Sequence, residues 1–553
     1  MNNFDKNFHL NMSPLYGTFI FMLLMLWASE VKADVENDDF IEEIVVVGTA
    51  EMQDATDVSQ DLTVIETLMP TMSFTAGGYG GAALFNERGA QTVHTTVYKN
   101  GVPVNDAGSG WYDFAHDIVS GLESVKIVSG PNGVLYGSGS LGGTVFINDE
   151  ISNQAVARVG DDHTLVNVAM FDSVSITSFD VNNDSVRNDN TEQDEYKNTT
   201  VKTVKDILGF KVAMSHVDYD YDYDNCYTAS FSQSNDCLQS GEKTDISMRN
   251  NNFTLGYSKA NSEYFTEGVS TWESDAKRYY FDARESFQLG YPPATFIAGI
   301  TYDKEEYAGQ DQDNISGYAT INFEDRFQLG TRLSEDARVY RVGYQRDGFF
   351  GNFSTSYRNP TLYQLFGDSW VQPNPELEPE EGMGLELGYL GFSAFAYDFK
   401  ENIDYDGSIS QYVNTGEYST KGLRFQEAYS VPYGSLSVFL AYTDTDQPRV
   451  PEYKGSISYY AVVGLTSAEL RYRGQFDRMP GPYDGAELED ISSFDFVQDR
   501  QHLPDQLGCG APSWDRTHIV TNEHVVRKCR SVTVGDNADK QVAASVLEAD
   551  RRN

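Results

Sequence analysis

The stretch that decides the fold runs from Leu84 to Asn148 and reads LFNERGAQTVHTTVYKNGVPVNDAGSGWYDFAHDIVSGLESVKIVSGPNGVLYGSGSLGGTVFIN. Short apolar runs at 95–98, 124–128 and 144–147 alternate with glycine-rich turns, which predicts short strands joined by tight turns. Six glycines fall between Gly130 and Gly143, ends included. The backbone there must therefore take positive φ angles or pass close to another surface.

Glycine-rich loops can also bind phosphate groups, and this alternative is disfavoured. The chain has no GxxxxGKS or GxxxxGKT segment, and no strand, loop and helix pattern surrounds these glycines.

The same stretch resembles the plug domain of TonB-dependent outer-membrane receptors. The resemblance rests on the Arg-Gly pair at 88–89, the run YKNGVPV at 98–104, and SVKIVSGP at 124–131 followed by LYG and LGG. It implies a plug domain over residues 51–150, inside a large antiparallel transmembrane β-barrel. The signature positions are Arg88, Gly101, Gly130, Pro131, Tyr136, Gly137, Gly142 and Gly143.

The composition argues against a nucleic-acid partner and is compatible with a barrel. The 553 residues include 83 acidic and 40 basic side chains, and the formal net charge of −43 disfavours binding to a phosphate backbone. Mean hydropathy is −0.45, and no apolar run of about 18 residues follows the N-terminal region, so helical membrane spans are not expected. Strands of a membrane barrel alternate apolar and polar residues, so their average hydropathy resembles that of a water-soluble protein.

The N-terminal region predicts export. Residues 18–28 (TFIFMLLMLWA) have the length of the apolar segment of a signal peptide, and Val31, Lys32 and Ala33 form a small-x-small cleavage pattern. We expect residues 1–33 to be a signal peptide and Asp34 to begin the mature chain. Initiation at Met12 and an uncleaved membrane anchor are the alternatives.

Residues 34–50 are predicted to be a periplasmic segment. A β-prone run stands alone in this polar tail, and its place ahead of the plug-like stretch resembles the TonB box, which receptors of this family offer to the energy-transducing protein TonB. A free strand can add to the edge of a partner's sheet through backbone hydrogen bonds. An ordinary first strand is the alternative. The box residues are Glu43, Ile44, Val45, Val46 and Val47.

Residues 151–500 are predicted to form the transmembrane barrel. Between loops rich in Asp, Asn and Gly, segments such as 468–477 place apolar side chains on one face and polar ones on the other. The alternation at 318–324 and 394–400 likewise predicts apolar side chains that face outward, among them Phe395, Tyr397 and Phe399. The resemblance implies a mostly β barrel of the roughly 22-stranded type. The last strand or strands are expected to be missing from it.

Two further segments resemble paired boxes in the barrels of these receptors: YRNPTLY at 357–363 and NPELEPE at 374–380. The runs at 414–416 and 421–422 resemble a later strand of the same family. Haem receptors of the family place a histidine between the two boxes. Residues 361–373 contain none, so a haem ligand is disfavoured.

Residues 501–553 differ in character from the barrel. The run TNEHVV at 521–526 resembles the histidine motif of trypsin-like serine peptidases of the periplasmic Deg type, with His524 as the general base. Peptidases of this family also need an aspartate that orients the histidine and a serine nucleophile, and we recognise no counterpart of either in this sequence. We therefore expect a truncated, inactive peptidase fragment and no enzymatic activity.

One acidic segment is a candidate metal site. On a strand, the alternating carboxylates of Asp218, Asp220, Asp222 and Asp224 would project from one face, where a Ca²⁺ ion would relieve their repulsion. A solvated acidic strand end is the alternative, and no other cofactor is expected. Nearby, Cys226 and Cys237 enclose a short polar loop, for which an oxidising compartment predicts a disulfide, with two free thiols as the alternative.

Together these features predict a receptor in the cell outer membrane that takes up a scarce ligand, such as a siderophore or cobalamin. Its expected partners are TonB, the extracellular ligand and outer-membrane lipid. A secreted peptidase with a β-rich N-terminal module and a passive porin-like channel are the alternatives. The incomplete catalytic triad argues against the peptidase, and the plug signature argues against the passive channel.

Overall fold

The computed structural model describes residues 50–54, 72–76, 80–117, 122–159, 163–184, 193–228, 230–291, 293–323, 326–431, 434–463, 466–479, 491–500, 532–534 and 542–544. The chain divides into two compact units. The first contains residues 1–425, 441–453 and 476–489, and the second contains residues 426–440, 454–475 and 490–553. The signal peptide, the box at 43–47 and His524 lie outside the described residues.

A five-stranded sheet forms the centre of the first unit, in the order β1-β6-β7-β4-β5. The parallel pair is β4 with β7, and the other neighbours are antiparallel. Phe85, Val97, Ile127 and Val145 fill its core. Its strands are β1 (Ala50–Asp54), β4 (Thr95–Lys99), β5 (Val102–Pro103), β6 (Leu122–Ser129) and β7 (Gly143–Asp149), beside the hairpin β2 (Met72–Ala76) and β3 (Ala83–Glu87), the turns η1 (Thr92–His94) and η2 (Phe114–His116), and the helix α4 (Gly133–Tyr136).

A second, much larger sheet of the first unit is antiparallel throughout and pairs each strand with the next from β8 to β25, passing over the small pair β13 and β14. The residues of β25 after Phe425 belong to the second unit. The strands are β8 (Gln154–Val159), β9 (His163–Met170), β10 (Val174–Asp184), β11 (Gln193–Ile207), β12 (Phe210–Tyr223), β13 (Cys226–Tyr227), β14 (Gln233–Ser234), β15 (Cys237–Arg249), β16 (Phe253–Thr266), β17 (Val269–Leu289), β18 (Ala294–Tyr307), β19 (Gln310–Phe323), β20 (Phe327–Ser334), β21 (Arg338–Arg346), β22 (Phe349–Arg358), β23 (Glu380–Tyr389), β24 (Phe392–Asp406) and β25 (Gln411–Val431).

The second unit contains parts of β26 (Gly434–Thr445), β27 (Pro451–Val463) and β28 (Thr466–Arg478), together with β29 (Ile491–Arg500), and β28 pairs antiparallel with β29. A short pair, β30 (Val532–Val534) and β31 (Val542–Ala544), lies in the same unit. No described helix is long and apolar enough to cross a membrane. The expected strand number of the barrel stays a prediction.

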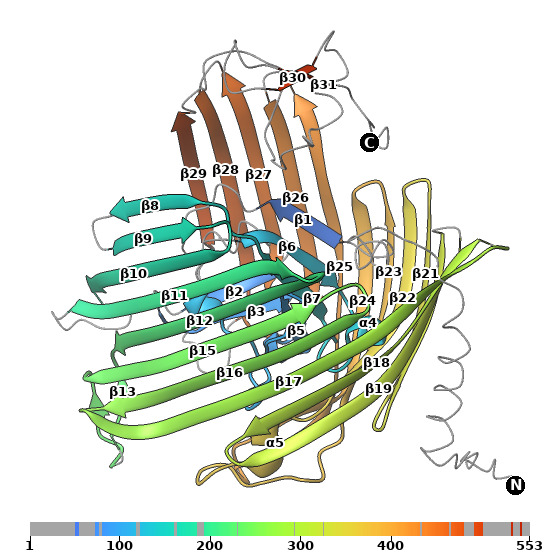
Figure 1. The fold of residues 1–553 in the computed structure, drawn as a ribbon. Helices are drawn as coiled ribbons and strands as arrows, with labels where there is room; N and C mark the ends of the chain where they lie inside the picture. Colours follow the sequence, from blue (N-terminus) through green and yellow to red (C-terminus); the bar gives the residue numbers. More distant parts are fainter. Residues whose placement is uncertain are drawn as a thin grey trace, which may run out of the picture. The chain divides into compact units, whose positions relative to one another are not determined.

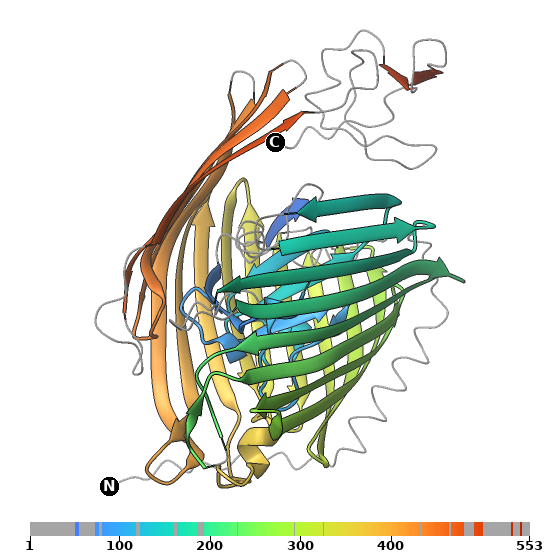
Figure 2. The same ribbon diagram turned by 90° about the vertical axis from the view of Figure 1, so that its left-hand side faces the viewer.

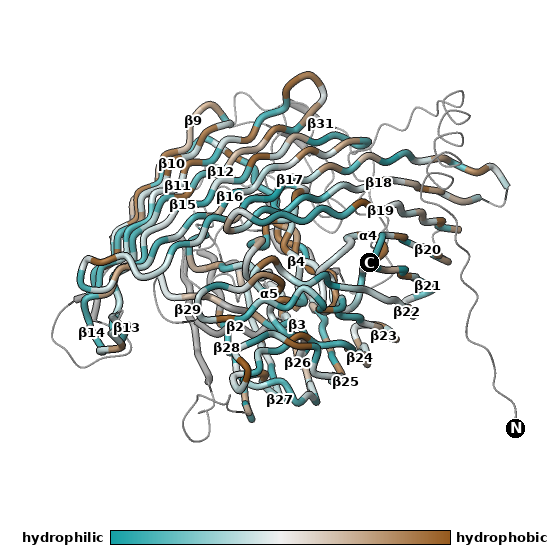
Figure 3. The backbone as a smooth tube through the Cα atoms, turned by 90° about the horizontal axis from the view of Figure 1, so that it is seen from below, coloured by the Kyte–Doolittle hydropathy of each residue, from teal (hydrophilic) through white to brown (hydrophobic). Residues whose placement is uncertain are grey.

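The large sheet of the first unit curves around the smaller one, so strands β2 to β7 lie on its concave side (Figures 1 and 2). Strand β23 shows how the sequence produces the two faces. Glu380, Gly382, Gly384, Glu386 and Gly388 are buried and alternate with exposed Glu381, Met383, Leu385, Leu387 and Tyr389. Figure 3 shows the same banding of hydrophilic and hydrophobic residues along β11, β12 and β15.

The prediction that the aromatic residues of 394–400 face outward is wrong. Phe395, Tyr397 and Phe399 on β24 are buried and pack against Ala90 and Leu141 of the smaller domain. The reason is that the concave side of the sheet here holds a protein domain rather than water, so an apolar face can point inward. Alternation reveals two faces but does not say which of them is inside.

Candidate ligand pocket and the contacts that hold the inner domain

A pocket of about 280 Å³ lies where the inner domain meets one end of the large sheet. One wall is the loop around Asp106 and Gly110, and the opposite wall comes from the ends of β18 and β19 and the segment after β22, which includes α5 (Leu362–Phe366). Its lining residues include Asp106, Arg278, Asp303, Glu305, Asp313, Asn314, Asp336, Arg358, Asn359 and Thr361.

Side-chain hydrogen bonds fix the loop wall. Buried Asn105 accepts from the backbone N–H of Val97 at 2.7 Å and donates to the carbonyl of Gly110 at 3.1 Å. Asp106 Oδ1 accepts from the backbone N–H groups of Gly108 at 3.0 Å and Ser109 at 2.7 Å. The loop is therefore held in place by its own hydrogen bonds.

Acidic side chains outnumber basic ones in the pocket lining. Five acidic residues, Asp106, Asp303, Glu305, Asp313 and Asp336, line it with two arginines. Arg278 pairs with Asp303 at 2.5 Å and with Glu305 at 3.2 Å, so its charge is already balanced inside the pocket.

The second arginine, Arg358, connects the pocket to a buried carboxylate. Its Nε donates to Glu380 Oε2, and its Nη1 lies 3.5 Å from Gln364 Oε1. Gln364 is itself held by a capping box with Thr361 at the start of α5. Arg358 Nη2 has no hydrogen-bond partner among the described residues, although Arg358 is only 3% exposed.

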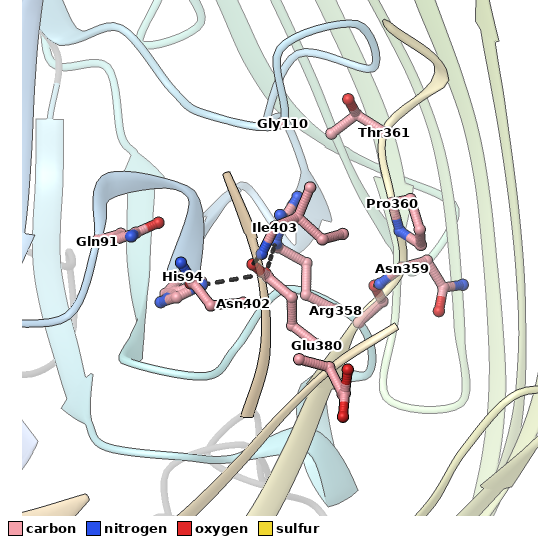
Figure 4. Close-up of polar contacts among 12 residues, drawn as sticks. Gln91, His94, Gly110, Arg358, Asn359, Pro360, Thr361, Glu380, Asn402 and Ile403 are labelled. Carbon is pink, nitrogen blue, oxygen red and sulfur yellow. Dashed lines mark hydrogen bonds and ion pairs between the residues drawn. The ribbon is translucent and has the colours of Figure 1, made fainter. Parts of the chain in front are cut away.

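Glu380 also joins the inner domain. His94 Nε2 lies 3.0 Å from Glu380 Oε2, and the backbone N–H of Ile403 donates to Glu380 Oε1 at 2.7 Å (Figure 4). The other ring nitrogen of His94 lies 2.8 Å from the hydroxyl of Tyr418 on β25. One carboxylate on β23 thus links an arginine of the pocket wall to a histidine of the inner domain.

A second buried ion pair lies close by on the same strand. Arg88 Nη1 is 3.0 Å from Glu386 Oε1 and also donates to the hydroxyl of Tyr397 at 2.6 Å. Burial alone would lower the pKa of Arg88, but Glu386, Tyr397 and Glu87 together outweigh it and raise that pKa above its ordinary value. Arg88 therefore stays charged, and breaking this pair would leave a buried charge unmatched.

Two lysines hold the other side of the inner domain. Lys202 on β11 lies 2.9 Å from Asp149, and Lys99 on β4 lies 3.5 Å from Asp117 and 3.4 Å from Asp245 on β15. Burial by itself would raise the pKa of Asp149, but Lys202 and Lys99 lower it below its ordinary value. The Lys202–Asp149 and Lys99–Asp245 pairs join strands β11 and β15 of the large sheet to the inner domain.

The predicted signature glycines shape the surface of the inner domain that faces the sheet. At Gly130, φ is +79°, and an added Cβ would lie 2.7 Å from the hydroxyl oxygen of Tyr397. At Gly142, an added Cβ would lie 2.3 Å from the Cβ of Ala90. Gly101 and Gly137 also have positive φ, Gly143 begins β7, and Tyr136 ends α4. The carbonyl of Pro131 accepts a hydrogen bond from Ser354 on β22.

The acidic segment differs from the expected column. Asp218, Asp220 and Asp222 lie at alternate positions of β12, but Asp224 follows the end of the strand and is buried. No group of three or more His, Cys, Asp or Glu side chains that could hold a metal is found among the described residues. The calcium site remains a prediction without geometric support. The disulfide between Cys226 and Cys237 is confirmed.

Sequence reasoning missed His94, Arg358, Glu380 and Glu386 as a connected set. Arg358 and Glu380 lie inside the two boxes noted in the sequence, and Glu386 follows Glu380 at an even spacing among glycines. For Glu380 and Glu386, the signal is a carboxylate on the glycine-rich face of a strand, because such a face has room for another domain.

Comparison with known proteins identifies the inner domain. Residues 37–144 match the family described as TonB-dependent Receptor Plug Domain. The chain carries a TonB-dependent receptor plug. The plug is therefore the small sheet with its loops, and the signature residues from Arg88 to Gly143 lie within the matched region.

Curated relatives extend beyond the plug. The chain is 24% identical over 390 residues to the vitamin B12 transporter BtuB of Photobacterium profundum, and 24% identical over 428 residues to BtuB of Vibrio vulnificus. These matches cover 61% and 66% of this chain, and 62% and 68% of the two relatives. The matched part thus spans less than two thirds of the length of the first relative.

Solved structures share the fold. A mutant of the ferric enterobactin receptor PfeA of Pseudomonas aeruginosa, in complex with enterobactin, superposes with a TM-score of 0.61 at 13% identity, over 82% of this chain and 92% of that one. The siderophore receptor PirA of Acinetobacter baumannii gives a TM-score of 0.59 at 14% identity, over 83% and 92%. A plug enclosed by a β-barrel, as in TonB-dependent receptors, is thus supported, whereas the trypsin-like resemblance of 501–553 gains no support.

Proposed function

We propose that this protein is an outer-membrane receptor that binds a scarce ligand in the pocket beside Asp106 and imports it with energy from TonB. The observation that carries the proposal is the buried plug. Ion pairs at Arg88, Lys99 and Asp149 and the hydrogen bond between His94 and Glu380 hold a folded domain on the concave side of the sheet, where it would obstruct free diffusion. A channel blocked in this way needs work to open.

The outward face of the large sheet supports a location in the membrane. Met383, Leu385 and Leu387 on β23 are 39%, 47% and 46% exposed, and Val166, Val168 and Met170 on β9 are exposed at alternate positions. Exposed apolar side chains at every second position suit contact with lipid. The plug-domain match supports the outer membrane as the location that we propose.

The partners follow from the same argument. TonB would pair with residues 43–47 by strand addition, and the ligand would reach the pocket from the side where the long segments between β22 and β23 and between β12 and β15 lie. The BtuB relatives are named vitamin B12 transporters and the structural neighbours siderophore receptors, so both ligand types belong to the proposal. We propose no catalytic activity, because this sequence contains no GxSGG-like nucleophile segment to accompany the histidine motif at 521–526.

Uptake in a bacterial host that lacks its own receptors tests the function. The full chain would be expressed in this host, with and without TonB, and supplied with radiolabelled iron chelates and corrinoids. The proposal requires at least one of them to accumulate only when TonB is present. Accumulation that ignores TonB would instead favour the passive channel.

A further inference from the structure

We propose that the pocket selects a ligand that bears a positive charge beside uncharged oxygen acceptors, such as an iron chelate of the hydroxamate type with a free ammonium group, and rejects polyanionic chelates. The inference rests on the proposed uptake function and adds the chemical class of the ligand.

The first support is the balance of charge. Arg278 is shared by Asp303 and Glu305, so these three groups together keep one negative charge. Asp313 and Asp336 are exposed at the rim and take part in no ion pair with the described residues. A concave site lined by charges of one sign concentrates ions of the other sign.

Asp106 contributes a further carboxylate on the plug side. Its Oδ1 is occupied by Gly108 and Ser109, whereas its Oδ2 accepts no hydrogen bond from the part of the chain that the structure describes. Because the loop bonds already fix this side chain, the carboxylate is positioned to receive a ligand ammonium group without further ordering.

The second, independent support is the unpartnered donor of Arg358. The positive charge of this side chain is matched by Glu380, which does not line the pocket, and Nη2 remains without a partner among the described residues although the side chain is almost fully buried. A buried donor of this kind costs stability unless an acceptor reaches it. A neutral carbonyl or hydroxamate oxygen satisfies it, whereas several anionic oxygens would also meet the surrounding carboxylates.

A matched set of probes separates charge from shape. We would use one linear ferric trihydroxamate in three forms: with its terminal ammonium free, with this amine acetylated, and with it succinylated so that it ends in a carboxylate. Affinity for the full chain in detergent would be measured by fluorescence quenching. We expect the ammonium form to bind about tenfold or more tightly than the succinylated form, with the acetylated form between them. The difference should shrink as salt is raised.

Substitutions then assign the effect to the pocket. Asp106→Asn combined with Asp336→Asn should reduce the preference for the ammonium form several-fold, since asparagine retains an oxygen for Gly108 and Ser109. The matched control is Asp311→Asn on the same hairpin as Asp313. Asp311 is exposed, lies 3.6 Å from Lys304 and does not line the pocket.

Three results would overturn the ligand class: equal or tighter binding of the succinylated form, a preference that the double variant leaves intact, or no binding of the ammonium form at about 1 mM. If one of these results came together with TonB-dependent import of some other compound, the uptake function would stand and the ligand class would be wrong. Tight binding of the ammonium form without any TonB-dependent import would support the ligand class and contradict the uptake function.

Discussion

His94 of the plug and Glu380 of β23 meet through Nε2 and Oε2 at 3.0 Å, and Arg358 donates to the same oxygen from the wall of the ligand pocket. His94 and Glu380 are 0% and 1% exposed. Under the proposed function, a ligand that displaces Arg358 would change the contact that holds the plug. The shared carboxylate would then link ligand binding to the position of the plug.

Glu380→Ala should loosen the plug. The substitution leaves the Arg358 guanidinium buried without its carboxylate, and removing one member of a buried pair costs about 3 kcal/mol or more. We expect urea to expose the plug to protease at a lower concentration, and conductance through planar bilayers to rise. Glu381→Gln, on the exposed face of the same strand, is the control. Equal urea dependence in both variants would show that Glu380 does not hold the plug.

Acid should weaken the plug through His116. Burial, aided by Lys243, lowers the pKa of this histidine to about 3, and its ring stacks on Tyr219 with centroids 3.5 Å apart. In the unfolded chain its pKa is about 6.5, so between these values the unfolded state binds more protons. The free energy of unfolding should therefore fall as the pH drops from about 6.5 toward 3.

Replacing His116 tests this assignment. His116→Phe keeps a ring against Tyr219 and cannot titrate, so urea unfolding of the plug should lose part of its slope against pH. His163→Phe on β9 is the control, since that histidine is only partly buried. A slope unchanged in His116→Phe would place the acid sensitivity elsewhere.

The disulfide should stabilise one loop only. Replacing both Cys226 and Cys237 with serine removes a bridge that spans 11 positions, worth about 3 kcal/mol or less. Limited proteolysis should then cut near residues 228–236 faster, while ligand affinity and plug protection stay as in the parent. A global loss of stability would contradict this local role.

If residues 43–47 are the TonB box, a substitution there should block import without weakening ligand binding. Val46→Pro removes a backbone donor and fixes φ, so strand addition to TonB should fail. Import should drop to the level of a host without TonB, while affinity in detergent stays unchanged. Val46→Thr, which retains the donor and the β-branched shape, should import normally. Parent-level import by the proline variant would show that residues 43–47 are not the TonB box.

Calcium binding has a direct test at β12. If Asp218, Asp220 and Asp222 hold the ion, Ca²⁺ should protect the neighbouring loop from protease, and Asp220→Asn should abolish this protection. Titration calorimetry that shows no heat at about 1 mM Ca²⁺ would leave only a solvated acidic strand end.

Local patterns in the sequence determined much of this protein. Alternating side chains at period two predict strands wherever one face meets an apolar environment, and glycine runs such as 130–143 predict a backbone that passes close to another surface. The bridge between Cys226 and Cys237 was equally predictable, because two cysteines 11 positions apart enclose a single polar loop.

Only the tertiary structure decided which strand faces point inward and which charges meet. Phe395, Tyr397 and Phe399 face the plug, a domain that lies far away from them in the sequence. The alternation of side chains shows that the strand has two faces, but it does not tell which face points inward. His94 and Glu380 are 286 positions apart, and Arg88 and Tyr397 are 309 apart. Such pairs depend on the register of every intervening strand and on where the plug rests, and neither is encoded by residues near them in the chain.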